Sequence, residues 1–491
     1  MNMYSETPLV CAASSVAGLP DDAQDVLNEL VAVWSRKWAR NVLRQQYVDM
    51  HVDVKNLGIA IPEEIASGLE VVSCWPEKAV HSLASRCVWD GVVSKSGTED
   101  PFELSDILRD NRFDVDLPQA IVSELIHSVA FISTTPGDTA SGEPEVVVMP
   151  HSAQWASAVW DRSRRAISAG LLVNATDKYQ RPVRLTLLTP FDAIVCETRG
   201  SGWFVSDVRS HGLGRVPMEA LPFRPSLDRP FGRSRVSRAV MTITDRAVRA
   251  ALRMDISSEL YTAPGLLLRG LDEETWSAIK ASWTWQLGSV KGITRDEDGN
   301  VPEVTSIPQQ SMLPFVEQLR ELAMEFAAAT SLPVSSLGIV QDNPSSADAI
   351  YAAKEELVVE AANANRVNGY ALSRVYQNIV MLRDGLDFVD DELKSVSTRW
   401  RNPAMPSIVS QADAMVKQIS ALPDLALTDV ALEEFGYTAE QIVRIRSEIR
   451  RAKGVAALDK ALSDLAQGTS KPTEFIDVGE DEAVNDGSYA A

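Results

Sequence analysis

The sequence is short of the side chains that build metal sites and disulfide frameworks, with only four cysteines and five histidines in 491 residues. The cysteines form no C-x-x-C pair, and no histidine lies within one helical turn of another. The spacing therefore gives no indication of a zinc cluster or a disulfide framework, and the cysteines are expected to be buried free thiols. They are Cys11, Cys74, Cys87 and Cys196.

Long apolar runs are also missing. The longest, such as the one that ends at Met149, are too short to cross a bilayer. The N-terminal stretch MNMYSETPLVCAASSVAG has no basic residue before its apolar part, which is not typical of a secretory signal. We therefore expect a folded protein that has no membrane segment and is made in the cytoplasm.

Motifs of the common catalytic sites are absent: there is no G-x-x-x-x-G-K-[ST], no H-E-x-x-H and no G-x-S-x-G. Gly212 and Gly214 are followed by Arg215 rather than by the third glycine of a phosphate loop. The stretch RDEDGN looks like a calcium loop, but Thr305 stands where the bidentate Glu belongs. The sequence predicts no catalytic residue, no metal and no cofactor.

Positive charge is scarce, with 47 Lys and Arg against 68 Asp and Glu, a net charge of −21. Tight binding to nucleic acid requires Lys and Arg to neutralise phosphates. General adhesion to DNA or RNA is therefore excluded, and any contact with DNA must be local or weak.

Hydrophobic periodicity predicts an α+β protein that is mainly helical. Helical spacing of apolar residues covers 21–47, 76–89 and 118–125, whereas 145–223 carries short alternating or β-branched runs typical of strands. Further helices are expected at 234–261, 312–330, 346–383, 407–422 and 438–465. Asp298-Gly299 suits the tight turn of a β-hairpin. The acidic C-terminal tail has too few apolar residues to fold.

One long block is the most distinctive part of the chain. It reads GRVPMEALPFRPSLDRPFGRSRVSRAVMTITDRAVRAALRMDISSELYTAPGLLLRG and contains Gly232-Arg233-Ser234. It resembles the central block of the portal proteins of long-tailed bacteriophages, in the SPP1-type group common in phages of actinobacteria. The segments LGIAIPEEI, TSLPVSSLGIVQDNPSSADAIYAAKEELVVEA and FGYTAEQIVRIRSEIRRA resemble the same family in the same order. The resemblance covers about Trp34 to Leu465, and leaves both ends of the chain unmatched.

This resemblance implies a portal fold with wing, stem, clip and crown, and subunits arranged in a dodecameric ring. It assigns 1–20 to an N-terminal arm, 21–233 to the wing with the β-rich module at 145–223, 234–262 and 311–330 to two stem helices, 263–310 to a clip with a β-hairpin, 331–344 to a tunnel loop, 345–406 to a long wing helix and its connection, 407–467 to the crown and 468–491 to a disordered acidic tail. The expected place is the capsid vertex of a virion, after assembly in the host cytoplasm.

The implied partners are further copies of the chain, double-stranded DNA in the tunnel, the major capsid and scaffold proteins, the terminase large subunit and the head-tail connector. An acidic chain without an ATP site suits a passive conduit for DNA. Two alternatives remain open from the sequence: another structural protein of the phage head and tail, or a packaging enzyme for nucleic acid.

Two sets of residues are candidates for a functional site. The resemblance places a tunnel loop at 331–344, where short polar groups are expected to face DNA: Ser335, Ser336, Gln341 and Asn343. The stem helices carry complementary stripes at helical spacing, so they are expected to meet as repeated Arg–carboxylate pairs within and between subunits. The basic stripe is Arg235, Arg238, Arg246, Arg249 and Arg253, and the acidic stripe is Glu317, Glu321 and Glu325. The alternatives are that the arginines hold phosphates or that both stripes are merely solvated.

Overall fold

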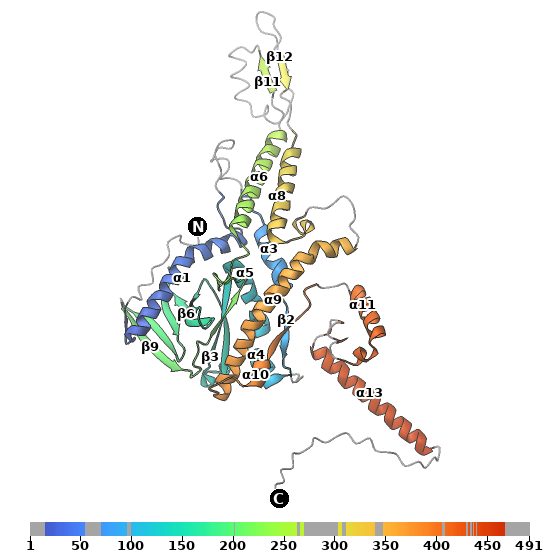
Figure 1. The fold of residues 1–491 in the computed structure, drawn as a ribbon. Coiled ribbons are helices and arrows are strands. Elements are labelled where there is room, and N and C mark those ends of the chain that lie inside the picture. Colours follow the sequence, from blue (N-terminus) through green and yellow to red (C-terminus); the bar gives the residue numbers. More distant parts are fainter. Residues whose placement is uncertain are drawn as a thin grey trace, which may run out of the picture. The chain divides into compact units, whose positions relative to one another are not determined.

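The computed structural model describes residues 15–54, 70–95, 100–200, 202–262, 266–269, 303–306, 311–338, 347–404, 408–428, 431–432, 435, 437 and 439–466. The chain divides into two compact units, Met1–Met405 and Pro406–Ala491 (Figure 1). The described residues form more helix than strand, in agreement with the predicted α+β class. None of the described helices is long and apolar enough to span a lipid bilayer.

Helix α1 (Asp21–Val48) packs on one face of a six-stranded sheet in the larger unit. The sheet has the order β1-β9-β8-β7-β6-β5, in which β1 is parallel to β9 and the other neighbours are antiparallel. Apolar residues of α1 at helical spacing, including Leu27, Leu30, Trp34 and Trp38, are buried against alternate residues of the strands. The strands are β1 (Val16–Ala17), β5 (Ala156–Asp161), β6 (Ala166–Thr176), β7 (Pro182–Leu188), β8 (Asp192–Arg199) and β9 (Gly202–Ser210).

A second sheet, of order β10-β3-β4, packs on the other face of the first. Its central strand β3 (Val129–Pro136) lies between β10 (Met218–Pro222) and β4 (Val146–Ser152). Val129 and Phe131 face the six-stranded sheet, whereas Ala130 and Ile132 belong to the helical core on the opposite side. Successive side chains of a strand point to opposite faces, so β3 is buried on both sides and its sequence is apolar without alternation.

A layer of helices covers the remaining face of the second sheet and completes an α/β/β/α arrangement (Figure 1). The largest apolar cluster of the protein joins this layer to the sheet, with Phe113, Leu125, Phe326 and Tyr376 among its fully buried members. The helices are α3 (Trp75–Ala84), α4 (Leu104–Asp110), α5 (Phe113–His127) and α9 (Ala347–Asp384). A short antiparallel pair, β2 (Trp89–Val93) with β13 (Ser397–Trp400), and helix α10 (Asp391–Ser395) lie nearby. Single 3-10 turns occur at η1 (Pro101–Glu103) and η2 (Thr139–Ser141).

Helices α6 (Arg238–Thr262) and α8 (Leu313–Thr330) form a pair whose packed lower half joins the helical core (Figure 1). Strand β11 (Leu266–Arg269) follows α6, and β12 (Glu303–Ser306) precedes α8; the two strands pair antiparallel at the end of the helix pair. At the other end, the 3-10 helix η4 (Val334–Leu337) follows α8.

The smaller unit contains helices α11 (Ile408–Ala421) and α13 (Ala439–Ala466), with the 3-10 helix η5 (Pro423–Leu427) after α11. Met415, Ala431 and Ile442 are its buried apolar residues among those described. Most described side chains of α13 are exposed, Val455 and Leu458 among them.

Most predicted elements are confirmed, and three predictions are wrong in their limits. The β region begins at Val129 rather than at 145, because β3 supplies the centre of the second sheet. The helix expected at 76–89 ends at Ala84, because Trp89 begins β2. The helix expected from 234 begins at Arg238. The turn predicted at Asp298-Gly299 lies outside the described residues, and β12 pairs with β11 in the part that is described.

One polar contact lies inside the helical layer, where α5 meets α9. The amide nitrogen Nδ2 of Asn368 donates a hydrogen bond of 2.8 Å to Oε2 of Glu124, and both side chains are fully buried. Burial raises the pKa of Glu124 to about 8, although the bond from Asn368 acts in the opposite direction. The carboxyl is therefore protonated at neutral pH, which avoids an unpaired charge in the core.

A fold that raises the pKa of an acid holds more protons than the unfolded chain, so its stability falls as pH rises. For Glu124 this loss of stability falls in the pH range between the ordinary pKa of 4.5 and the raised pKa of about 8. We predict that Glu124→Gln removes a decline on the order of 1 kcal/mol per pH unit in this window. Urea unfolding at pH 5 and pH 7.5 measures it, with Glu29→Gln on the exposed face of α1 as control. An unchanged pH dependence would contradict the assignment.

Candidate functional site

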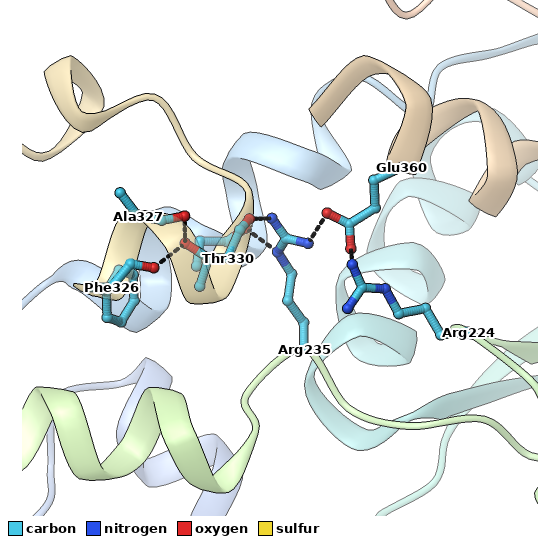
Figure 2. Close-up of polar contacts among 7 residues, drawn as sticks. Arg224, Arg235, Phe326, Ala327, Thr330 and Glu360 are labelled. Atoms are coloured by element: carbon cyan, nitrogen blue, oxygen red, sulfur yellow. Dashed lines mark hydrogen bonds and ion pairs between the residues drawn. The ribbon is translucent and has the colours of Figure 1, made fainter. Parts of the chain in front are cut away.

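The foot of the α6–α8 pair is the place where the structure gathers charged groups in its interior. Arg235 lies just before α6, and its side chain is only 3% exposed. Its Nη1 forms an ion pair of 2.6 Å with Oε2 of Glu360, which comes from α9 and is also buried. Figure 2 shows the two side chains pointing toward each other from different elements.

The other nitrogens of Arg235 bind backbone carbonyls. Nε donates a hydrogen bond of 2.8 Å to the carbonyl of Ala79 in α3. Nη2 donates one of 2.5 Å to the carbonyl of Thr330, the last residue of α8 (Figure 2). Arg235 therefore connects α3, α8 and α9 through one guanidinium group. Burial lowers the pKa of Arg235, and Glu360 raises it again by stabilising the charge.

The backbone is held in place both where it carries Arg235 and where α8 ends beside the guanidinium group. Ser234 Oγ donates a hydrogen bond of 2.5 Å to the carbonyl of Ile126. The backbone nitrogen of Arg235 donates one of 2.8 Å to the carbonyl of Leu125. These bonds hold the segment against the end of α5, so the helical path of α6 begins only at Arg238. At the end of α8, Ser331 adopts a left-handed conformation with φ of 52°, which terminates the helix next to Thr330.

A cavity of about 560 Å³ opens beside the ion pair. Arg224 lines it, is 59% exposed and pairs with the second oxygen of Glu360 at 2.7 Å. Ser331 and two further acids of α9, Glu355 and Glu356, line the same cavity. Glu360 thus carries one buried arginine on its inner side and one partly solvated arginine on its outer side.

No group of three or more His, Cys, Asp or Glu side chains suited to a metal ion occurs among the described residues. His151 accepts or donates a hydrogen bond of 2.8 Å with Ser133 Oγ, and burial lowers the pKa of His151 to about 4. A neutral, half-buried histidine bonded to a serine is consistent with a structural role.

The family model described as "Phage portal protein, SPP1 Gp6-like" matches residues 69–454. This chain belongs to the SPP1 portal family. Two relatives called "Portal protein" agree: that of Mycobacterium phage L5 is 25% identical over 452 residues, 88% of each chain, and that of Mycobacterium phage D29 is 26% identical over 411 residues, 80% of this chain and 81% of the other.

A chain in the structure "Virion of native gene transfer agent (GTA) particle" is similar over 84% of this chain and 94% of that one, at 14% identity and a TM-score of 0.44. At that level the likeness carries no further argument. The portal family is a structural one, so the family assignment favours the portal interpretation over the two alternatives left open by the sequence.

The residues predicted for the stem fall into different environments in this portal-family chain. Arg246 and Glu325 meet across α6 and α8, with Nη1–Oε2 and Nη2–Oε1 distances of 2.5 and 3.3 Å. Placing Arg235 on the stem stripe was wrong, because it precedes the helix and is buried with Glu360. The other predicted stem residues form no ion pair within the described part of the chain: Arg238, Arg249, Arg253, Glu317 and Glu321.

The predicted tunnel loop is described only in its first part. Ser335 and Ser336 belong to η4, where Ser335 is exposed and Ser336 is half-buried. Gln341 and Asn343 lie outside the described residues. Glu360 is the functional candidate that sequence reasoning missed. The only signal for it is a charged residue among apolar neighbours of α9, Leu357 and Ala361, both of which are buried.

We predict that Arg235→Met lowers the free energy of unfolding by about 3–5 kcal/mol, because it leaves Glu360 buried with a single, partly exposed arginine. Arg246→Met, which removes an exposed pair, should cost about 0–1 kcal/mol. The double change Arg235→Met with Glu360→Met should recover much of the loss, since it removes both charges. Urea unfolding followed by tryptophan fluorescence measures all three. Equal losses for Arg235→Met and Arg246→Met would contradict this account.

Proposed function

We propose that this chain forms a dodecameric ring at one vertex of a phage capsid, through which double-stranded DNA enters and leaves the head. The observation that supports this proposal most directly is the helix pair α6–α8 in a chain of the SPP1 portal family. The pair ends in the β11–β12 sheet on one side and is anchored by Arg235 on the other. A pair of packed antiparallel helices fixed to a compact body suits the wall of a channel, because repetition around a ring would set the pairs side by side.

The parts of the proposed ring follow from the elements. The sheets and helices before residue 233, together with α9, supply the wing; α6 and α8 supply the stem; β11 and β12 belong to the clip; and α11 and α13 supply the crown. The proposed partners outside the ring are capsid and scaffold proteins, the terminase large subunit and the head-tail connector. These assignments rest on the family membership and on the chain order of the elements.

The tunnel loop is proposed to begin at Ser331, directly after the carbonyl that Arg235 holds. Ser335 and Ser336 offer hydroxyl groups without charge, and Gln341 and Asn343 offer amides. Short neutral donors contact phosphates without neutralising them, and so contribute little to the salt-dependent retention that charged contacts produce. Such a surface suits a DNA molecule that must slide.

The stem arginines and glutamates that lack a partner within the described chain are proposed to pair with a neighbouring subunit. Arg253 lies in α6 and Glu317 in α8, and neither forms an ion pair in the described part of one subunit. An exposed pair contributes about 0–1 kcal/mol, so its effect depends on repetition around the ring. The competing role, in which these arginines hold phosphate in the tunnel, would oppose sliding.

Charge reversal tests this pairing. We predict that Arg253→Glu lowers the fraction of closed rings, and that Glu317→Arg in the same chain partly restores it, because the swapped charges again attract. Negative-stain images of purified protein, with subunits counted around each ring, give the measurement. Arg109→Glu, at an exposed pair with Asp106 on α4, is the matched control. Unchanged rings in the single variant would refute the pairing, and the absence of any ring in the parent protein would refute the proposed assembly.

A further inference from the structure

The second half of α1 carries a concentration of positive charge that the channel does not use. Arg36, Lys37 and Arg40 are exposed, and Arg44 is half-buried. We call these four residues the α1 basic stripe. They stand in a chain whose net charge is −21, so their clustering runs against its composition.

The fold holds the stripe in a fixed orientation. Trp34 Nε1 donates a hydrogen bond of 2.8 Å to the carbonyl of Gln154, and Asn41 Nδ2 donates one of 3.0 Å to the carbonyl of Ala153. Trp38 and Val42 are buried in the sheet below. With this side of the helix tied down, the opposite side must face outward, and residues four apart lie above one another along it.

No member of the stripe forms an ion pair within the described part of the chain. Arg44 Nη1 donates a hydrogen bond of 3.1 Å to the carbonyl of His127. Because a carbonyl is neutral, the positive charge of Arg44 stays uncompensated. Burial and four neighbouring arginines lower the pKa of Lys37, which places like charges around it. The four are Arg40, Arg36, Arg44 and Arg229, the last from the exposed turn between β10 and α6.

The helix dipole does not account for the stripe. Cations stabilise a helix when they lie in its last turn, and the last turn of α1 has no basic residue. The acids Asp21 and Asp22 in the first turn do fit the dipole. The stripe therefore repels itself at a cost that nothing within the described chain offsets, which indicates an anionic partner.

We propose that the α1 basic stripe binds the phosphate backbone of double-stranded DNA on the outside of the protein. Arg36, Arg40 and Arg44 follow one another along one side of the helix at about 6 Å per step, so they form a line of cations that can follow a line of phosphates. Guanidinium groups bind phosphate oxygens in a planar fork, and each strand of DNA offers one phosphate per about 3.4 Å of the duplex axis. This contact is separate from the tunnel and independent of the ring.

An acidic protein surface is the competing occupant, because Leu43 and Leu227 are exposed apolar side chains on the same two segments. Protein interfaces need an apolar centre with few charges, whereas the stripe itself is made of cations spaced along a rod. The geometry favours DNA, and the experiment below includes the acidic polypeptide as a competitor.

The test uses the full chain and covalently closed circular DNA, which cannot thread through a closed ring. The variant Arg36→Gln, Lys37→Gln, Arg40→Gln removes three exposed charges and leaves Arg44, which is bonded to His127. We expect at least about a tenfold loss of affinity at low salt. We also expect the slope of log affinity against log salt to fall in magnitude by about 2.7, since each phosphate contact contributes about 0.9.

The matched control neutralises three exposed arginines in the β5–β6 turn, Arg162, Arg164 and Arg165. It changes the net charge equally and should retain the binding. An equal loss in both variants would show attraction to net charge alone and would overturn the proposal, as would an unchanged stripe variant. Polyglutamate that displaces the DNA at equal charge concentration would assign the stripe to an acidic protein instead, which also overturns it.

Discussion

The ion pair between Arg235 and Glu360 constrains the helical layer of the larger unit, because each buried charge depends on the other for compensation. Removing such ions from water costs several kcal/mol each, and only good geometry with further hydrogen bonds offsets that cost. The carbonyls of Ala79 and Thr330 supply those bonds. The arrangement of α3, α8 and α9 is therefore specified at one point, where a displacement of any helix would leave a charge or a carbonyl unpaired.

The same contact determines how the chain leaves helix α8. Thr330 ends α8 with its carbonyl held by Arg235, and Ser331 turns the backbone through a left-handed conformation into η4. A segment that starts from a fixed carbonyl has a fixed starting direction, whatever follows it. The anchoring of α8 and the origin of the proposed tunnel loop are thus one structural feature rather than two.

The sequence predicts elements with strong periodicity well and long-range contacts poorly. The amphipathic repeat of α1 and the uninterrupted pattern of α9 lead directly to these helices. Arg235 fits the stripe of α6 by spacing alone, yet it lies outside the helix because bonds to α5 hold its backbone elsewhere. Strand β3 was missed because burial on both faces removes alternation. Only the fold brings Glu360 next to Arg235.

The location of positive charge has a physical consequence for a protein through which DNA passes. A contact that neutralises a phosphate retains the polymer, and the retention multiplies with the number of such contacts. Cations in a channel would oppose movement unless they are paired, and in the proposed ring Glu325 would compensate Arg246 in this way. Cations away from the proposed channel would meet no such constraint, and those of the α1 basic stripe form no ion pair in the described chain. An acidic protein can therefore let DNA slide in one place and hold it in another, because the two tasks depend on local pairing rather than on net charge.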